Sequence, residues 1–108
     1  DQPAGSVPLL LNPQVVEVAL RREYRADMRD EGVSGTTHTW VCIEEDGRVS
    51  GAAVDRTSGS LRLDRAALRI GLVMRFAAPV DGADWASVSF DFSRETGPGL
   101  GEEIRRGG

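Results

Sequence analysis

The segment TTHTWVCIEE at residues 36–45 alternates between two kinds of side chain, and this alternation decides the fold. Successive side chains of a β-strand point to opposite faces of a sheet. One face of this segment therefore carries Thr37, Thr39, Val41 and Ile43, and the other carries His38, Trp40 and Cys42. The pattern predicts a strand near residues 36–44 that turns one face to the core.

A hairpin follows this strand. Asp46-Gly47 is the residue pair typical of a tight hairpin turn, and it predicts a return strand over residues 48–56. Val49 and Val54 lie five residues apart, an odd spacing that cannot place both on one face of a regular strand. Gly51 between them therefore indicates a bulge that resets the register.

A helix precedes the hairpin. Asn12 and Pro13 form a helix-start signal, because Asn can cap free amides and Pro suits the first helical position. Apolar side chains then recur every four residues at Val16, Leu20, Tyr24 and Met28. The spacing predicts one helix over residues 13–31, ended by Gly32.

A second helix and a third strand follow the hairpin. Residues 62–75 have helical spacing of apolar side chains, and Gly71 inside them weakens the helix by about 1 kcal/mol relative to Ala. A close contact with the sheet would explain that glycine. Residues 85–93 alternate again, with one face made of Ala86, Val88, Phe90 and Phe92 and the other of Trp85, Ser87, Ser89 and Asp91.

This order of elements predicts an α+β fold. We expect two layers, in which a three-stranded antiparallel sheet of order 2-1-3 is covered on one face by two helices. Residues 1–11 are expected to form an extended N-terminal arm, 12–95 the folded domain and 96–108 a flexible, Gly-rich C-terminal tail. The expected core comprises Val16, Leu20, Val41, Ile43, Val54, Leu63, Ala67, Ile70, Val88, Phe90 and Phe92.

Composition argues against several function classes. The formal net charge is −4 and no basic run exceeds two residues, so we expect no nucleic-acid partner. Cys42 is the single cysteine and His38 the single histidine, too few for a disulfide or a typical metal site. His38 and Cys42 might suggest a nucleophile and its base, but residues four apart on a strand lie roughly 13 Å apart, beyond hydrogen-bond reach. We therefore expect no enzyme, no cofactor and no small-molecule substrate.

The candidate functional site is the sheet face turned away from the helices. It should display His38, Trp40, Cys42, Trp85, Ser87, Ser89 and Asp91. Two tryptophans on an uncovered face suit docking on a protein partner, because tryptophan gives a large contact area for little entropy. The alternative is a cross-strand aromatic pair that only stabilises the sheet.

Several short motifs occur in a characteristic order between Tyr24 and Phe92. They are YRADMRDEGVSG (24–35), DGRV (46–49), TSG (57–59), LDRAAL (63–68) and MRF (74–76). Together they resemble the C-terminal domain of TonB-type energy transducers. The resemblance implies a periplasmic protein–protein interaction domain, peripheral to a membrane. In that family, the strand that corresponds to Trp85–Phe92 pairs with a short peptide of an outer-membrane transporter by strand addition.

Two functional hypotheses remain open. In the first, the chain is an accessory or structural subunit docked on a membrane-protein complex. In the second, it is the interaction domain of a TonB-type transducer that engages an outer-membrane receptor. A homodimer through the edge strand is a further possible association. No segment is apolar enough to span a bilayer. The start at Asp1 suits a mature protein whose leader was removed, or a piece trimmed from a longer chain.

Overall fold

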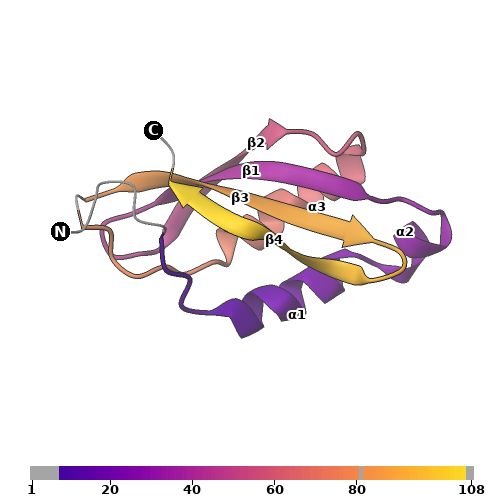
Figure 1. The fold of residues 1–108 in the computed structure, drawn as a ribbon, viewed down its shortest axis with the longest axis horizontal. Helices are drawn as coiled ribbons and strands as arrows, with labels where there is room; N and C mark the ends of the chain where they lie inside the picture. The colour runs from indigo at the N-terminus through magenta and orange to yellow at the C-terminus, as the bar shows by residue number, and fades with distance from the viewer. Residues whose placement is uncertain (1–7, 81, 107–108) are drawn as a thin grey trace.

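The computed structural model describes residues 8–80 and 82–106 of the chain. Their helices and strands are α1 (Pro13–Glu23), α2 (Ala26–Asp30), β1 (Gly35–Ile43), β2 (Val49–Arg56), α3 (Leu61–Leu72), β3 (Asp84–Ser93) and β4 (Gly97–Arg106). The strands form one antiparallel sheet of order β2-β1-β3-β4, and α1 and α3 lie on the same side of it (Figure 1). The α+β fold and the inner strand order are confirmed, but the structure adds a fourth strand and a third helix.

The core lies between the sheet and the helices. Along β1 the buried side chains are Thr37, Thr39, Val41 and Ile43, and along β3 they are Ala86, Val88, Phe90 and Phe92. From the helices it includes Val16, Leu20, Leu63, Ala67 and Ile70. The predicted core is thus confirmed except at Val54, which is 37% exposed because it lies on β2, an edge strand of the described sheet.

Two local predictions about glycine are also confirmed. The register of the β1–β2 pair shifts between Cys42 and Ile43, whose partners are Gly51 and Val49, so Ser50 is the extra residue of a bulge. In α3, a β-carbon on Gly71 would lie 3.1 Å from Cγ1 of Val41. The helix therefore approaches the sheet closely at this glycine.

The single helix expected over residues 13–31 is wrong. The chain leaves helical geometry at Tyr24 and Arg25, and the short helix α2 begins at Ala26. The Tyr24 ring is buried against Phe92, with 5.5 Å between ring centroids, and its hydroxyl donates a hydrogen bond of 2.6 Å to the carbonyl of Val33. The break lets Tyr24 reach the acceptor that a buried phenol requires, so tertiary packing overrides the helical pattern.

The flexible tail expected over residues 96–108 is also wrong for the part that the structure describes. Residues Gly97–Arg106 form β4, which pairs antiparallel with β3. Leu100 and Ile104 pack against the core from β4, so their burial compensates for the low strand propensity of the glycines around them. The tail predicted for residues 107–108 lies outside the described residues.

The N-terminal arm is held by backbone hydrogen bonds where the structure describes it. The N–H of Leu11 donates to the carbonyl of Arg75, and the N–H of Ala77 donates to the carbonyl of Leu9. Residues 75–77, which hold the arm, also meet the β1–β2 hairpin, because the N–H of Phe76 donates to the carbonyl of Gly47 over 2.8 Å. The predicted arm over residues 1–7 lies outside the described residues.

Candidate functional site

The seven predicted site residues all lie on one face of the sheet, which no described helix covers and which we call the open face. The register of β1 against β3 pairs Cys42 with Trp85, Trp40 with Ser87, His38 with Ser89, and Thr36 with Asp91. The opposite faces of both strands are buried under the helices. The alternation read from the sequence therefore brings side chains from two distant segments into four adjacent rows.

The two ends of the open face are exposed to solvent, and its middle is half-buried. Trp85 is 46% exposed, and Asp91 is exposed, whereas Trp40 and the side chains around it are half-buried. Trp40 and Trp85 belong to neighbouring rows, but no ring contact joins them among the described residues; the ring contact found is that of Tyr24 with Phe92. The exposed tryptophan is therefore not accounted for by an aromatic pair.

At one end of the open face, three polar side chains form a small hydrogen-bonded group. The thiol of Cys42 donates to Oε2 of Glu44 over 3.6 Å, and the hydroxyl of Ser50 donates to the same oxygen. Cys42 lies directly across from Trp85 in the β1–β3 register, so this polar group is next to the row of the exposed tryptophan. Within residues 8–80 and 82–106, no group of three or more His, Cys, Asp or Glu residues is arranged to hold a metal ion.

The strand predicted to offer its edge to a partner is not an edge strand. β4 lies along β3, so the free edges of the described sheet belong to β2 and β4. The approach is close at Gly101, where a β-carbon would fall 2.0 Å from the hydroxyl oxygen of Ser89. The prediction that Trp85–Phe92 presents unpaired backbone groups is therefore wrong, because the chain's own β4 occupies them.

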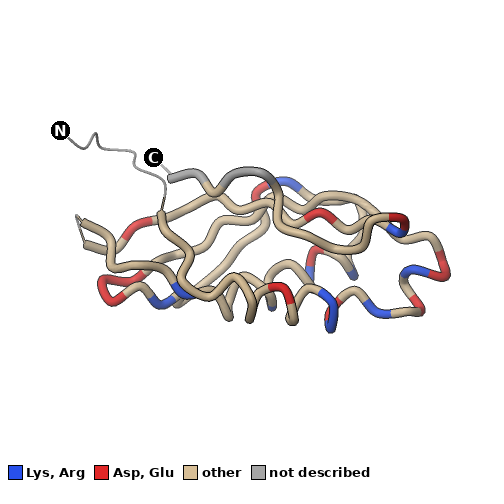
Figure 2. The backbone as a smooth tube through the Cα atoms, turned by 60° about the horizontal axis from the view of Figure 1, so that its bottom comes forward, with Lys and Arg blue, Asp and Glu red and all other residues tan. Residues whose placement is uncertain are grey.

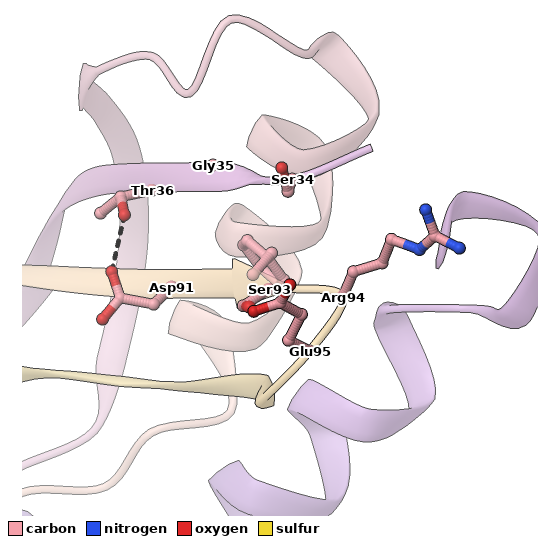
Figure 3. A pocket seen from close by; sticks show the side chains of 8 residues that line it. Ser34, Gly35, Thr36, Asp91, Ser93, Arg94 and Glu95 are labelled. Carbon is pink, nitrogen blue, oxygen red and sulfur yellow. Dashed lines mark hydrogen bonds between the residues drawn. The ribbon is translucent and has the colours of Figure 1, made fainter. Parts of the chain in front are cut away.

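A shallow polar pocket of about 650 Å³ adjoins the other end of the open face (Figure 3). The hydroxyl of Thr36 donates to Oδ1 of Asp91 over 2.7 Å within it, and Arg94 extends away from this pair in the figure. The complete lining is Ser34, Gly35, Thr36, Asp91, Phe92, Ser93, Arg94 and Glu95. Of these residues the sequence analysis named only Asp91 as a site residue. The polar residues at the ends of the two predicted strands were the signal that could have indicated the pocket.

Comparisons with known proteins give no assignment. No protein-family model, curated protein or solved structure matches this chain. The resemblance to the TonB C-terminal domain thus rests on the motifs between Tyr24 and Phe92. In the part of the chain that the structure describes, no helix has the length and apolar character needed to cross a membrane.

One acidic side chain, that of Asp64, is buried between the sheet and α3 and is fully hydrogen-bonded. Asp64, in the first turn of α3, accepts hydrogen bonds from the hydroxyls of Thr37, Thr57 and Ser58 and from the N–H of Ser58. Burial raises the pKa of Asp64, but these hydrogen bonds together outweigh it and hold the pKa below the ordinary value of 3.8. A carboxylate so fully engaged joins β1, α3 and the loop between β2 and α3.

Proposed function

We propose that this chain is a non-enzymatic protein-interaction domain that docks on a protein partner through the open face of its sheet. The observation that carries the proposal is Trp85, which is 46% exposed on a sheet face that no described helix covers. Tryptophan is prominent among the residues that dominate binding energy at protein interfaces, because it buries a large area at a low entropic cost.

The surroundings of Trp85 suit such an anchor. Trp40 and Cys42 lie half-buried beside it, while Ser87 and Ser89 continue the face as small polar groups. Protein interfaces commonly combine an aromatic centre with a polar rim. The exposed carboxylate of Asp91 and the polar pocket next to it lie at the far end of the face, where rim contacts are expected.

The finer part of the proposal is that the domain is a periplasmic accessory subunit, peripheral to a membrane and docked on a membrane-protein complex. Its support is the resemblance of the motifs between Tyr24 and Phe92 to the TonB C-terminal domain. The open face allows this role without any strand exchange, since the docking groups are side chains that already face outward.

The second candidate is the interaction domain of a TonB-type energy transducer, which would bind an outer-membrane receptor by strand addition. The same resemblance supports it. Because β4 covers the edge of β3, a peptide strand would have to pair with β2 or β4, or displace β4. A homodimer through an edge strand would meet the same restriction. The two candidates therefore differ in where the partner lies, on the open face or along an edge.

A binding measurement separates them. The full chain is isolated from its native cells with its bound proteins, and its affinity for the main partner is measured by calorimetry. We expect Trp85→Ala to weaken binding by about 2 kcal/mol or more, and Trp40→Ala similarly. Glu45→Ala, at the exposed hairpin tip, is the matched control and should change affinity little.

Unchanged affinity in both tryptophan variants, with their folds intact by circular dichroism, would contradict docking through the open face. If a proline placed at Ala53 in β2 abolished binding in the same assay while the tryptophan variants did not, strand addition at that edge would replace it.

A further inference from the structure

The helix side of the molecule carries a second exposed apolar feature, a groove of about 310 Å³ between α1 and the end of α3. We call it the α1–α3 groove; it is lined by Gln14, Val15, Val18, Ala19, Arg22 and Val73. Val15 and Val18 are 52% and 54% exposed. Leu72, also exposed, precedes Val73 in sequence.

The groove arises because α1 has two apolar stripes. Val16, Ala19 and Leu20 are buried in the core. Val18 lies three positions after Val15, and Arg22 lies four positions after Val18, so these three share a different side of the helix. Core packing does not account for this second stripe, since both valines remain half-exposed to solvent.

Charge on the molecule is divided between the helix side and the sheet side. Residues 13–31 and 61–75, which include all three helices, contain eight arginines and six acidic residues, one of which is the buried Asp64. Residues 32–60 and 82–101 contain three arginines and seven acidic residues. The helix side is therefore net positive although the chain is net negative. Figure 2, which brings this side forward, shows a basic segment where α1 ends.

The arginines near the groove are available for a new contact. Arg21 and Arg22 reach Glu17 and Glu23 at 3.6 Å, and both guanidinium side chains are 62% exposed. The Arg21–Glu17 pair is exposed at both ends, and ion pairs of this kind contribute little to stability. Glu23 is only 15% exposed, but it keeps a closer contact of 2.8 Å with Arg69 if Arg22 turns away. These guanidinium groups can therefore turn to an external anion without a large loss to the fold.

We propose that the helix side rests on an anionic lipid bilayer, with Val15 and Val18 inserted at the interface and Arg22 and its neighbours on the lipid phosphates. Aliphatic side chains bordered by arginines are typical of interfacial helices, and anionic lipids attract basic groups near the surface. A protein partner is less suited to this side, because the exposed aromatic anchor lies on the open face. The contact leaves the open face free and does not depend on the proposed function.

The test is co-sedimentation of the full chain with vesicles at low salt. Vesicles of equal parts phosphatidylglycerol and phosphatidylcholine should bind the protein, and vesicles of phosphatidylcholine alone should bind at least about tenfold more weakly. Val18→Asp and Val15→Asp should each weaken binding to the anionic vesicles by about tenfold or more, and Arg22→Gln by about fivefold. Val80→Asp is the matched control, because Val80 is 93% exposed and outside the groove, and it should bind within about twofold of the parent.

Several results would overturn the proposal. One is the absence of binding to anionic vesicles, and another is binding that Val80→Asp weakens as much as Val18→Asp does. If the protein instead forms dimers that Val18→Asp dissociates, a second copy covers the groove. Val18→Ser serves as a milder variant, should Val18→Asp fail to give the parent circular dichroism spectrum; full vesicle binding by Val18→Ser and Val15→Asp would also count against insertion.

Discussion

The hydroxyl of Thr37 on β1 donates a hydrogen bond of 2.9 Å to Oδ1 of Asp64 on α3. The same carboxylate accepts hydrogen bonds from Thr57 and Ser58 in the loop before α3. One buried acid thus connects the central strand, the helix behind it and the connection between β2 and α3. The open face is the reverse side of β1, one of the two inner strands, so this attachment lies directly behind it.

Asp64→Asn should destabilise the domain. An amide can keep some of the acceptor contacts of Oδ1 but presents an NH2 group where the hydroxyl of Thr57 now donates. We expect the free energy of unfolding at pH 7 to fall by about 1–3 kcal/mol. Urea titration measures this change, and Asp55→Asn on the exposed part of β2 is the control.

The difference between the parent and Asp64→Asn should depend on pH. Since the pKa of Asp64 is lowered in the folded chain, its carboxylate stabilises the fold fully above the ordinary value of 3.8, and this contribution is lost as the pH falls through the lower folded pKa. The two stability curves should therefore run parallel near neutral pH and converge in acid. Curves that diverge as the pH falls would contradict this account of Asp64.

Two threonines on the buried face of β1 should respond oppositely to the same substitution. The hydroxyl of Thr39 is buried and finds no hydrogen-bond partner among the described residues, so Thr39→Val should raise the free energy of unfolding by about 1 kcal/mol. Thr37→Val removes a donor to Asp64 and should lower it by about 1–3 kcal/mol. Thermal and urea unfolding of both variants measure the signs, and equal signs would show that the two hydroxyls do not differ in this way.

Gly47 should be the least replaceable glycine of the hairpin region. It has φ of +91°, and a β-carbon there would lie 1.9 Å from the carbonyl oxygen of Phe76. Gly59 has a similar φ of +94° but nothing within 4 Å of such a carbon. Gly59→Ala should therefore cost about 1–2 kcal/mol from the backbone alone, and Gly47→Ala about 3 kcal/mol or more. Equal losses of stability would show that the contact with Phe76 is not rigid.

β4 should contribute to the stability of the domain. Leu100 is partly buried against the core, so Leu100→Ala should lower the free energy of unfolding by about 1–2 kcal/mol. Ile104→Val removes one methylene at a similar position and should have a smaller effect of the same sign. If Leu100→Ala unfolds at the parent temperature, β4 does not pair with β3 in solution.

Regular alternation made β1 and β3 predictable from sequence. Residues 37–43 carry apolar or threonine side chains at every second position, and residues 85–92 repeat the pattern, so the side chains on each face of the two strands followed directly. The register that pairs the strands into four rows was not part of the prediction. The bulge near Gly51 was predictable for the same reason, since an odd spacing of valines breaks the period.

The helix break and β4 were not predictable, because each depends on tertiary contacts. Tyr24 continues the four-residue spacing of α1, and its exit from the helix reflects two contacts, with the carbonyl of Val33 nine residues on and with the ring of Phe92 far away in sequence. In β4, glycines occupy every second position of residues 97–101, and the signal was limited to the even spacing of Leu100 and Ile104. The α1–α3 groove was missed because the sequence analysis followed one apolar stripe of α1 and did not consider Val15 and Val18.

Site-specific photocrosslinking tests the central claim, docking of a protein on the open face, most directly. A photoreactive benzophenone amino acid replaces Ser87, in the row beside Trp85, and in a separate variant it replaces Glu45 at the hairpin tip. Both full-length variants are produced in native cells and irradiated, and adducts are identified by mass spectrometry. The account predicts a specific adduct with one other protein from Ser87 and none from Glu45. An adduct from Glu45 but not from Ser87, or no adduct from either variant, would contradict it.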